Sequence, residues 1–283
     1  MKSFLLVFSI VLFVSCKKQV NSINNEPIAG EDLINVSYGT EPEQKMDLYL
    51  PKGRSADSTK LILLVHGGGW VTGDKAEFTS FIPVIQQKLP NYAIANINYH
   101  LASTTANHFP VQENDMKAAV DFLIKKGEEF KVSQKIVLLG ASAGGHLVTL
   151  QAYKYDTPKI KAVVDFYGPV DMASLYNNTV IPFNKSVIET LMGGTPSTNA
   201  ALYQQSSPIN FVTAQSPPTL IFHGDKDELV NLSQSVALKN KLQSLGIASE
   251  LAVYPNLGHA IWPQAIMNDA FSKIELFVKA NVH

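Results

Sequence analysis

The sequence has almost no cysteine, and its N-terminal apolar run is too short to cross a membrane. Cys16 is the only cysteine in 283 residues, so no disulfide can form within the chain. The apolar run extends only from Phe4 to Val14, whereas a transmembrane helix needs about 20 apolar residues. These absences argue against a disulfide-stabilised fold and against a transmembrane anchor in this stretch.

An excess of charge is also missing, as are the motifs of nucleotide and metal sites. The net charge of −1 at pH 7 argues against nucleic-acid binding and against electrostatic attraction to a membrane surface. The histidines and carboxylates show no H-x-x-E-H or comparable ligand spacing, and the chain has no G-x-G-x-x-G or Walker loop. We therefore expect no metal ion and no cofactor.

The N-terminus has the features of an export signal. Lys2 precedes the apolar run, and small residues follow it. We interpret residues 1–15 as a signal peptide, because Leu12–Cys16 resembles a bacterial lipobox with Phe13 in place of the usual leucine. Cys16 is then the candidate for lipid modification, although a cleaved signal followed by an incidental cysteine fits the same residues.

The next residues are expected to connect this anchor to one folded domain. Residues 16–31 are polar and poor in aromatic side chains, a composition typical of a tether. We expect an exported protein in the periplasm or at the cell surface, with membrane contact only through the lipid on Cys16. Residues 32–283 are long enough for a single α/β domain, and a hydrophobic content of 46% supplies a large core.

Short apolar runs alternate with amphipathic stretches along residues 32–283, the pattern of parallel strands joined by helices. Nearly unbroken runs such as Leu61–Val65 are typical of strands covered on both faces. We expect strands at Leu61–Val65, Ala93–Tyr99, Lys135–Leu139, Ala162–Phe166, Thr219–Phe222 and Glu250–Val253, with antiparallel edge strands near Asn35–Tyr38 and Met46–Leu50. We expect helices at Glu77–Leu89, Asn114–Lys126, Ala143–Tyr153, Leu232–Leu245 and Gln264–Lys279.

One segment breaks this alternation. Residues 169–218 carry helical pieces and several prolines but no clear strand. In a mostly parallel sheet, such an insertion lies over the carboxyl ends of the strands, where ligands bind. We expect a small lid there; an ordinary long connection is the alternative.

The segment from Gly140 to Gly144 contains a candidate nucleophile, Ser142. It follows an apolar strand and precedes a helix, so a tight turn projects the serine out of the sheet. Glycines two residues to either side leave space for that turn. A serine held in this way can act as a nucleophile if a base removes its proton.

The base is expected to be His259. It lies just after the last expected strand, in Pro255–His259, and it is the histidine after the serine that lies in a suitable loop. His283 is the terminal residue, and we expect His146 and His223 to form local hydrogen bonds within their own elements.

The acid is expected after the strand Thr219–Phe222. Asp225, Asp227 and Glu228 all follow that strand, and one carboxylate must face the imidazole N–H of the base. Asp225 is next to a glycine and suits a turn-capping role. Reasoning from these residues alone leaves the choice open.

Backbone N–H groups that could stabilise an oxyanion are expected in two places. His66–Trp70 contains three consecutive glycines directly after the first strong strand, so the backbone can approach a substrate closely. Ala143 follows the serine at the start of a helix and offers another N–H.

Taken in order, His66–Trp70, Gly140–His146, Gly224–Asp227 and Gly258–His259 resemble the α/β-hydrolase superfamily. The similarity is greatest to carboxylesterases of the hormone-sensitive-lipase-like and acetyl-xylan or feruloyl esterase type. The resemblance implies an α/β-hydrolase fold, with a mostly parallel central sheet and helices on both faces.

The same resemblance assigns roles to individual residues. It makes Ser142 the nucleophile, Asp227 the acid and His259 the base. Gly68, Gly69 and Ala143 supply the oxyanion N–H groups in this assignment, and His66 braces the glycine loop.

Trp70 and Trp262 flank the glycine loop and the histidine, and we expect them to wall the substrate pocket, with simple packing as the alternative.

The function that these features predict is a serine esterase acting on a small-molecule or oligosaccharide ester. Its substrates would carry short acyl or aryl groups, including acetyl or feruloyl groups on polysaccharide. A kynurenine-formamidase-like amidase and a non-catalytic carbohydrate-binding lipoprotein remain open.

Overall fold

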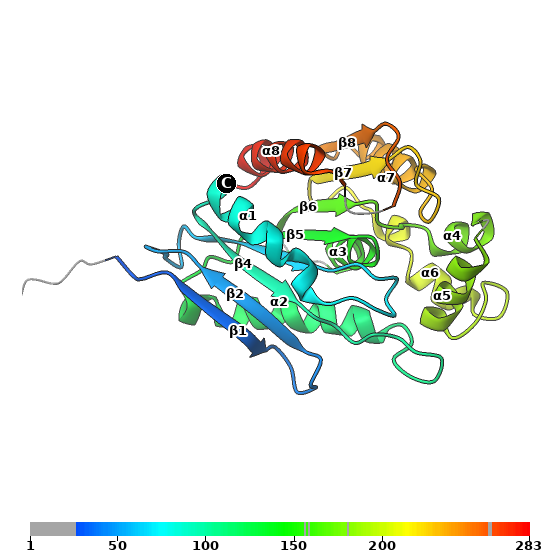
Figure 1. The fold of residues 1–283 in the computed structure, drawn as a ribbon, viewed down its shortest axis with the longest axis horizontal. Helices are drawn as coiled ribbons and strands as arrows, with labels where there is room; N and C mark the ends of the chain where they lie inside the picture. The colour runs from blue at the N-terminus through cyan, green and yellow to red at the C-terminus, as the bar shows by residue number, and fades with distance from the viewer. Residues whose placement is uncertain (1–26, 156, 158, 180, 260–261) are drawn as a thin grey trace, which may run out of the picture.

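The computed structural model describes residues 27–155, 157, 159–179, 181–259 and 262–283. The expected signal peptide and Cys16 lie outside these residues. The central element is an eight-stranded sheet with the order β1-β2-β4-β3-β5-β6-β7-β8 (Figure 1). Its strands are β1 (Glu31–Ser37), β2 (Lys45–Leu50), β3 (Lys60–Val65), β4 (Tyr92–Ile97), β5 (Ile136–Ala141), β6 (Ile160–Phe166), β7 (Thr219–Gly224) and β8 (Ser249–Tyr254).

The sheet is parallel except at one edge. β1 pairs antiparallel with β2, and β2 pairs antiparallel with β4, whereas all the other neighbouring pairs are parallel. The expected edge pair and the expected mostly parallel sheet are therefore confirmed. β1 begins at Glu31, and the Ile28 carbonyl accepts a hydrogen bond from Gly53 N–H, so the last residues of the expected tether are attached to the domain.

Helices cover both faces of the sheet. They are η1 (Lys75–Phe81), α1 (Ile82–Lys88), α2 (Val111–Phe130), α3 (Ala143–Lys154), α4 (Met172–Asn178), α5 (Pro182–Met192), α6 (Ala200–Gln205), η2 (Pro208–Phe211), α7 (Ser233–Ser244) and α8 (Gln264–Asn281). Leu61, Leu63 and Val65 pack with α2, α3 and α7, whereas Ile62 and Leu64 pack with α1 and α8. Because side chains alternate along a strand, one apolar run supplies both halves of the core.

The segment expected to form one helix at Glu77–Leu89 is instead divided into η1 and α1. Pro83 lies in the first turn of α1, where a residue without an N–H is tolerated, and inside a longer helix it would disrupt the hydrogen bonding. η1 contributes Glu77, Phe78 and Phe81 to the cavity described below.

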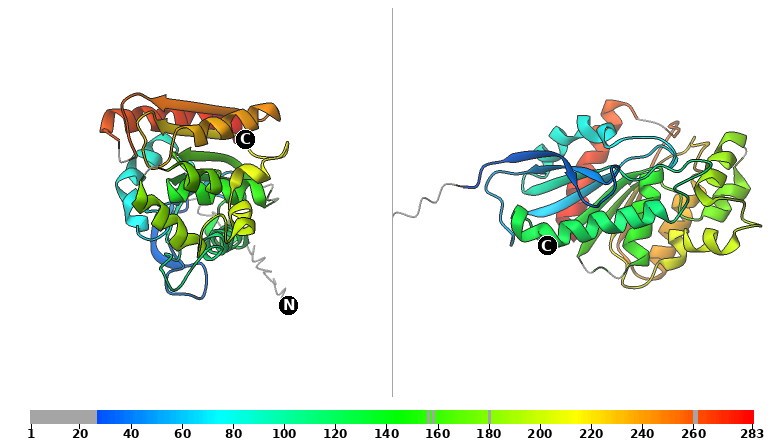
Figure 2. Two further views of the ribbon diagram at one scale, coloured as in Figure 1. Left: turned by 90° about the vertical axis from the view of Figure 1, so that its right-hand side faces the viewer. Right: turned by 90° about the horizontal axis from the view of Figure 1, so that it is seen from below.

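The insertion between β6 and β7 forms α4, α5, α6 and η2. These helices lie beyond the arrowheads of β5 and β6 in Figure 1, and they face the viewer in the left view of Figure 2. The insertion therefore lies at the carboxyl ends of the central strands, as expected. Leu175 of α4 and Val187 of α5 line the same cavity as Ser142.

Candidate active site

Ser142 occupies the sharp turn between β5 and α3. Its backbone has φ 56° and ψ −119°, and its N–H donates to the Phe166 carbonyl at 2.8 Å. A Cβ atom on Gly140 would lie 2.3 Å from the Gly144 carbonyl oxygen, and one on Gly144 would lie 2.0 Å from the Val65 carbonyl oxygen. Glycine is thus required at both positions for this turn to form.

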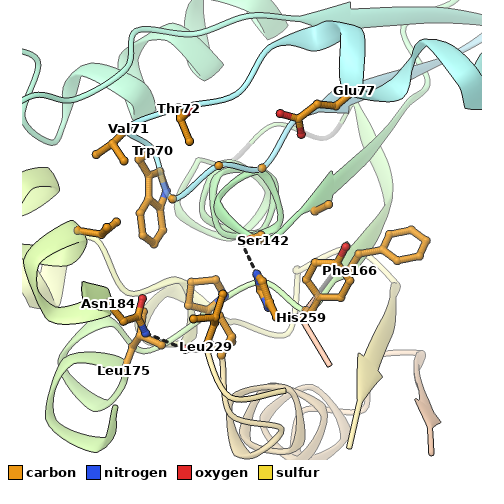
Figure 3. Close-up of a pocket in the computed structure, with 18 of the residues that line it drawn as sticks. Trp70, Val71, Thr72, Glu77, Ser142, Phe166, Leu175, Asn184, Leu229 and His259 are labelled. Atoms are coloured by element: carbon orange, nitrogen blue, oxygen red, sulfur yellow. Dashed lines mark hydrogen bonds between the residues drawn. The ribbon is translucent and has the colours of Figure 1, made fainter. Parts of the chain in front are cut away.

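His259 connects the serine to a carboxylate. Its Nε2 lies 2.7 Å from Ser142 Oγ, and its Nδ1 lies 2.7 Å from Asp227 Oδ2. A carboxylate can only accept, so Nδ1 carries the proton and Nε2 is the acceptor for the serine hydroxyl. Figure 3 shows the imidazole directed at the serine. Three side chains that follow β5, β7 and β8 therefore form one hydrogen-bonded chain.

Asp227 is held by donors from several directions. Its Oδ1 accepts from Leu229 N–H at 3.0 Å and Val230 N–H at 2.9 Å, and its Oδ2 faces both His259 and His223. Burial alone would raise the pKa of Asp227, but hydrogen bonds from His223 and His259 outweigh it and lower the pKa to about 2. The acid is thus a carboxylate over the whole range in which a histidine titrates.

Asp225, the alternative acid, faces a different group. Its Oδ1 accepts from Asn256 N–H at 2.7 Å, which ties the β7 loop to the loop carrying His259. Gly224 lies so close to this loop that a Cβ atom would be 2.2 Å from the Leu257 carbonyl oxygen. Asp225 and Gly224 therefore position the histidine loop, while Asp227 contacts the imidazole.

The glycine loop after β3 passes beside Ser142 in a left-handed conformation. Gly68, Gly69 and Trp70 have φ values of 97°, 59° and 62°, a region that only glycine enters readily. Within the described ranges, the N–H groups of Gly68, Gly69 and Ala143 donate no hydrogen bond. These groups are therefore available to a ligand at Ser142.

His66 lies at the start of this loop. Its Nδ1 is 2.8 Å from the Gly67 carbonyl oxygen, and its ring stacks on Tyr99 at 4.3 Å. Burial lowers the pKa of His66, against smaller opposing effects of the Gly67 carbonyl and nearby carboxylates. A neutral His66 therefore packs under the loop, where its contacts can brace the glycines.

The side chain of His146 forms hydrogen bonds with other elements of the fold, whereas it was expected to bond within α3. Its Nδ1 accepts from Trp70 Nε1–H at 3.1 Å, and its Nε2 donates to the Ser206 carbonyl at 2.7 Å. Trp70 lines the cavity, so one buried imidazole joins the glycine loop, the helix that follows Ser142 and the insertion.

Trp262 lies in a different place from the one expected. It is 4% exposed, its Nε1–H donates to the Gly258 carbonyl at 3.1 Å, and it is absent from the cavity wall. Its ring packs against Tyr167 and Tyr254. The packing alternative therefore describes Trp262, which supports the loop next to His259.

Ser142 opens into a cavity of about 370 Å³. Its wall is mainly apolar and comes from the glycine loop, η1, the insertion and α8, among other segments. The apolar residues include Trp70, Val71, Phe78, Phe81, Phe166, Leu175, Phe183, Val187, Leu229, Val230, Met267 and Phe271. A pocket of this size with a few polar groups is typical of small-molecule sites.

Sequence reasoning missed several contributors to this site. His223 lies 3.3 Å from Asp227 and donates to the Val230 carbonyl at 2.7 Å, whereas it was expected to bond only locally. The Tyr167 ring is 4.6 Å from that of His259. Met267 of α8 lines the cavity, and nothing in its local sequence indicates that α8 reaches this edge of the sheet.

Two other features are absent from the residues that the structure describes. No group of three or more His, Cys, Asp or Glu side chains there is arranged to hold a metal ion. No helix in this part of the chain has both the length and the apolar character of a membrane span.

The sheet order and the Ser142–His259–Asp227 chain at its carboxyl edge define an α/β-hydrolase with a serine triad geometry. Residues 46–242 match the model of the BD-FAE family, and the chain belongs to that family.

Relatives and solved structures agree with this class. The chain is 24% identical to Esterase LipC of Mycobacterium tuberculosis over 223 residues, which are 74% of this chain and 55% of LipC. It is 26% identical to the probable carboxylic ester hydrolase LipM of the same organism over 238 residues, or 79% of this chain and 54% of LipM. The chain thus spans about half the length of the curated relatives it matches.

A truncated carbohydrate esterase from gut microbiota superimposes with a TM-score of 0.73 at 26% identity, covering 87% of this chain and 96% of that one. A bifunctional GH43-CE protein of Bacteroides eggerthii gives a TM-score of 0.74 at 25% identity, covering 86% of this chain and 38% of that one. The expected α/β-hydrolase fold is thereby confirmed.

Proposed function

We propose that this protein is a serine hydrolase that cleaves carboxylic esters through an acyl-enzyme on Ser142. The observation that carries the proposal is the continuous hydrogen-bonded chain from Ser142 Oγ through His259 to Asp227, which begins at the wall of an apolar cavity. This arrangement has the parts that nucleophilic acyl transfer requires: a nucleophile, a base and a group that orients the base.

The proposed reaction starts when Ser142 Oγ attacks the ester carbonyl and His259 Nε2 takes the hydroxyl proton. Asp227 stabilises the imidazolium through its bond to Nδ1. The N–H groups of Gly68, Gly69 and Ala143 stabilise the oxyanion, each donor contributing about 2.7–4 kcal/mol. The imidazolium then protonates the leaving alcohol, and the acyl-enzyme is hydrolysed by a water molecule that His259 activates.

The proposed substrates are esters with short acyl or aryl groups, including acetyl or feruloyl groups on polysaccharide. The mainly apolar wall of the cavity supports a substrate with substantial apolar surface. Two structural neighbours are named as a carbohydrate esterase and a GH43-CE protein, which supports a carbohydrate-linked ester.

We also propose that the protein is exported and anchored through a lipid on Cys16; the sequence of residues 1–16 supports this.

Steady-state hydrolysis of esters and amides tests the activity. We expect turnover of 4-nitrophenyl acetate and acetylated xylan, with little turnover of N-formyl amides. Ser142→Ala should reduce ester turnover by at least about 10⁴-fold, because loss of a triad nucleophile has effects of this size. Preference for the amides would instead indicate an amidase, and absence of any turnover by folded protein would indicate a binding module.

A further inference from the structure

Among the residues that the structure describes, the wall of the cavity at Ser142 has one carboxylate and no lysine or arginine. Of the lining residues that the structure describes, only Glu77, Tyr167 and His259 are ionisable, and no lysine or arginine is among them. The neighbouring cation, Lys75, is buried against Asp47 with an Nζ–Oδ2 distance of 2.7 Å. A negatively charged substrate would therefore find no counter-charge in the wall.

Glu77 is fixed beside the glycine loop. It lies in η1, and its Oε1 accepts from Asp74 N–H at 3.3 Å in a capping box. Its other oxygen accepts no hydrogen bond within the described residues. In Figure 3, the carboxylate is directed from η1 toward the middle of the cavity, on the same side as the glycine loop.

Nothing near Glu77 neutralises its charge. Burial lowers the pKa of His66, so this imidazole is neutral at neutral pH. Lys75 on this turn is paired with Asp47, and Asp74 is a second carboxylate that lies outside the cavity wall. Glu77 is exposed to solvent, but it borders a mainly apolar cavity, where a charge on the ester has fewer waters to screen it than in bulk solvent.

We propose that Glu77 restricts this site to esters that bear no negative charge near the reacting carbonyl. The inference rests on the proposed ester hydrolysis and adds the substrate class: neutral esters, or esters with a cationic or hydroxyl donor facing Glu77. The residue sets specificity through its field, while its cap on η1 is a separate structural role.

The experiment compares matched neutral and anionic esters. For charge on the alcohol side, the pair is 3-acetoxybenzamide and 3-acetoxybenzoate. For charge on the acyl side, the pair is 4-nitrophenyl hexanoate and mono-4-nitrophenyl adipate. The readout is the ratio of kcat/KM for the anionic ester to kcat/KM for its neutral partner, in wild type, Glu77→Gln and Asp74→Asn at pH 7.5 and low salt.

Glu77→Gln removes the charge but keeps an oxygen that can accept from Asp74 N–H. We expect it to raise the anionic-to-neutral ratio by about tenfold or more in at least one pair, since such a charge contact is worth a kcal/mol or more. Asp74→Asn removes a carboxylate from the same turn and should change both ratios by less than about twofold, because Asp74 does not line the cavity.

Two results would overturn the inference while leaving the proposed function intact. In one, Glu77→Gln leaves both ratios within twofold of wild type although the neutral esters are hydrolysed. In the other, Asp74→Asn shifts the ratios as much as Glu77→Gln does, so that selectivity belongs to the general field. Failure of the wild type to hydrolyse any of the neutral esters would overturn the proposed function, and the inference with it.

Discussion

Ser142 is held in a backbone conformation that an L-residue rarely adopts, with φ 56°. Strain of this kind costs about 1–3 kcal/mol and persists only where surrounding contacts enforce it. Here the hydrogen bond from Ser142 N–H to Phe166 and the two flanking glycines do so. The strained turn places the Ser142 hydroxyl within hydrogen-bond distance of His259.

Single substitutions of Asp227 and Asp225 test which of the two aspartates acts as the acid. Asp227→Asn should reduce kcat by about 10³–10⁴-fold with a small effect on KM, because the amide presents a donor to His259 Nδ1 and favours the wrong tautomer. Asp225→Asn keeps an oxygen that can accept from Asn256 N–H and should change kcat by less than about fivefold. Steady-state kinetics on one neutral ester measures both, and equal losses would contradict the assignment of Asp227.

At the scale of residues, the position of a side chain is predicted best from the sequence when a local turn determines that position. Ser142 and the glycines of the loop after β3 belong to such turns. Asp225 and Asp227 are only two residues apart, and the difference lies in their partners, Asn256 and His259, which come from a distant loop. Trp262 lies near His259 in the chain but packs on Tyr167 and Tyr254, a contact that no local pattern encodes.

At the scale of elements, hydrophobic pattern was enough to predict the central strands. β3, β5 and β6 are buried on both faces, and their apolar runs match the observed bounds within two residues. The exact ends differ because hydrogen-bond partners on neighbouring strands decide them. The amphipathic pattern of residues 77–89 predicts a single helix, but Pro83, near the middle of the segment, divides it into η1 and α1.

α3 connects the elements around the site through His146. Burial is the main cause that lowers the pKa of His146, to about 4. Since this value is below the pKa of about 6.5 in the unfolded chain, the unfolded state binds the extra proton. The contribution to stability is complete above about pH 6.5 and is lost as the pH falls toward 4.

His146→Asn should therefore flatten the pH dependence of unfolding. The wild type should lose about 2 kcal/mol more unfolding free energy than the variant between pH 7 and pH 5. The cavity left by the smaller side chain lowers stability at both pH values, so the difference between them is the informative quantity. Urea unfolding at the two pH values measures it, and parallel losses in both proteins would contradict the neutral state of His146.

At the scale of the whole molecule, the site lies where one domain brings distant segments together. Ser142 and His259 are 117 residues apart in the chain, and both the insertion and α8 contribute to the wall of the same cavity. Motif order could predict that these segments meet, because parallel strands place their carboxyl ends on one edge. It could not predict Glu77 or Met267 in the wall, which depend on how the helices pack.

The proposed anchor concerns the whole molecule too. In a bacterial host that processes lipoproteins, the full-length chain should partition into the detergent phase of Triton X-114, because a lipidated cysteine adds acyl chains that the domain itself lacks. Cys16→Ser should move it to the aqueous phase. Detergent-phase recovery of the variant would contradict lipidation at Cys16.

Covalent labelling of Ser142 tests the central claim most directly. Folded wild-type protein treated with a fluorophosphonate should gain the mass of one phosphonyl group by intact mass spectrometry, and the modified peptide should contain Ser142. The Ser142→Ala variant, folded by circular dichroism, should remain unlabelled under the same conditions. An unlabelled wild type, or equal labelling of the variant, would contradict a nucleophilic serine activated by His259.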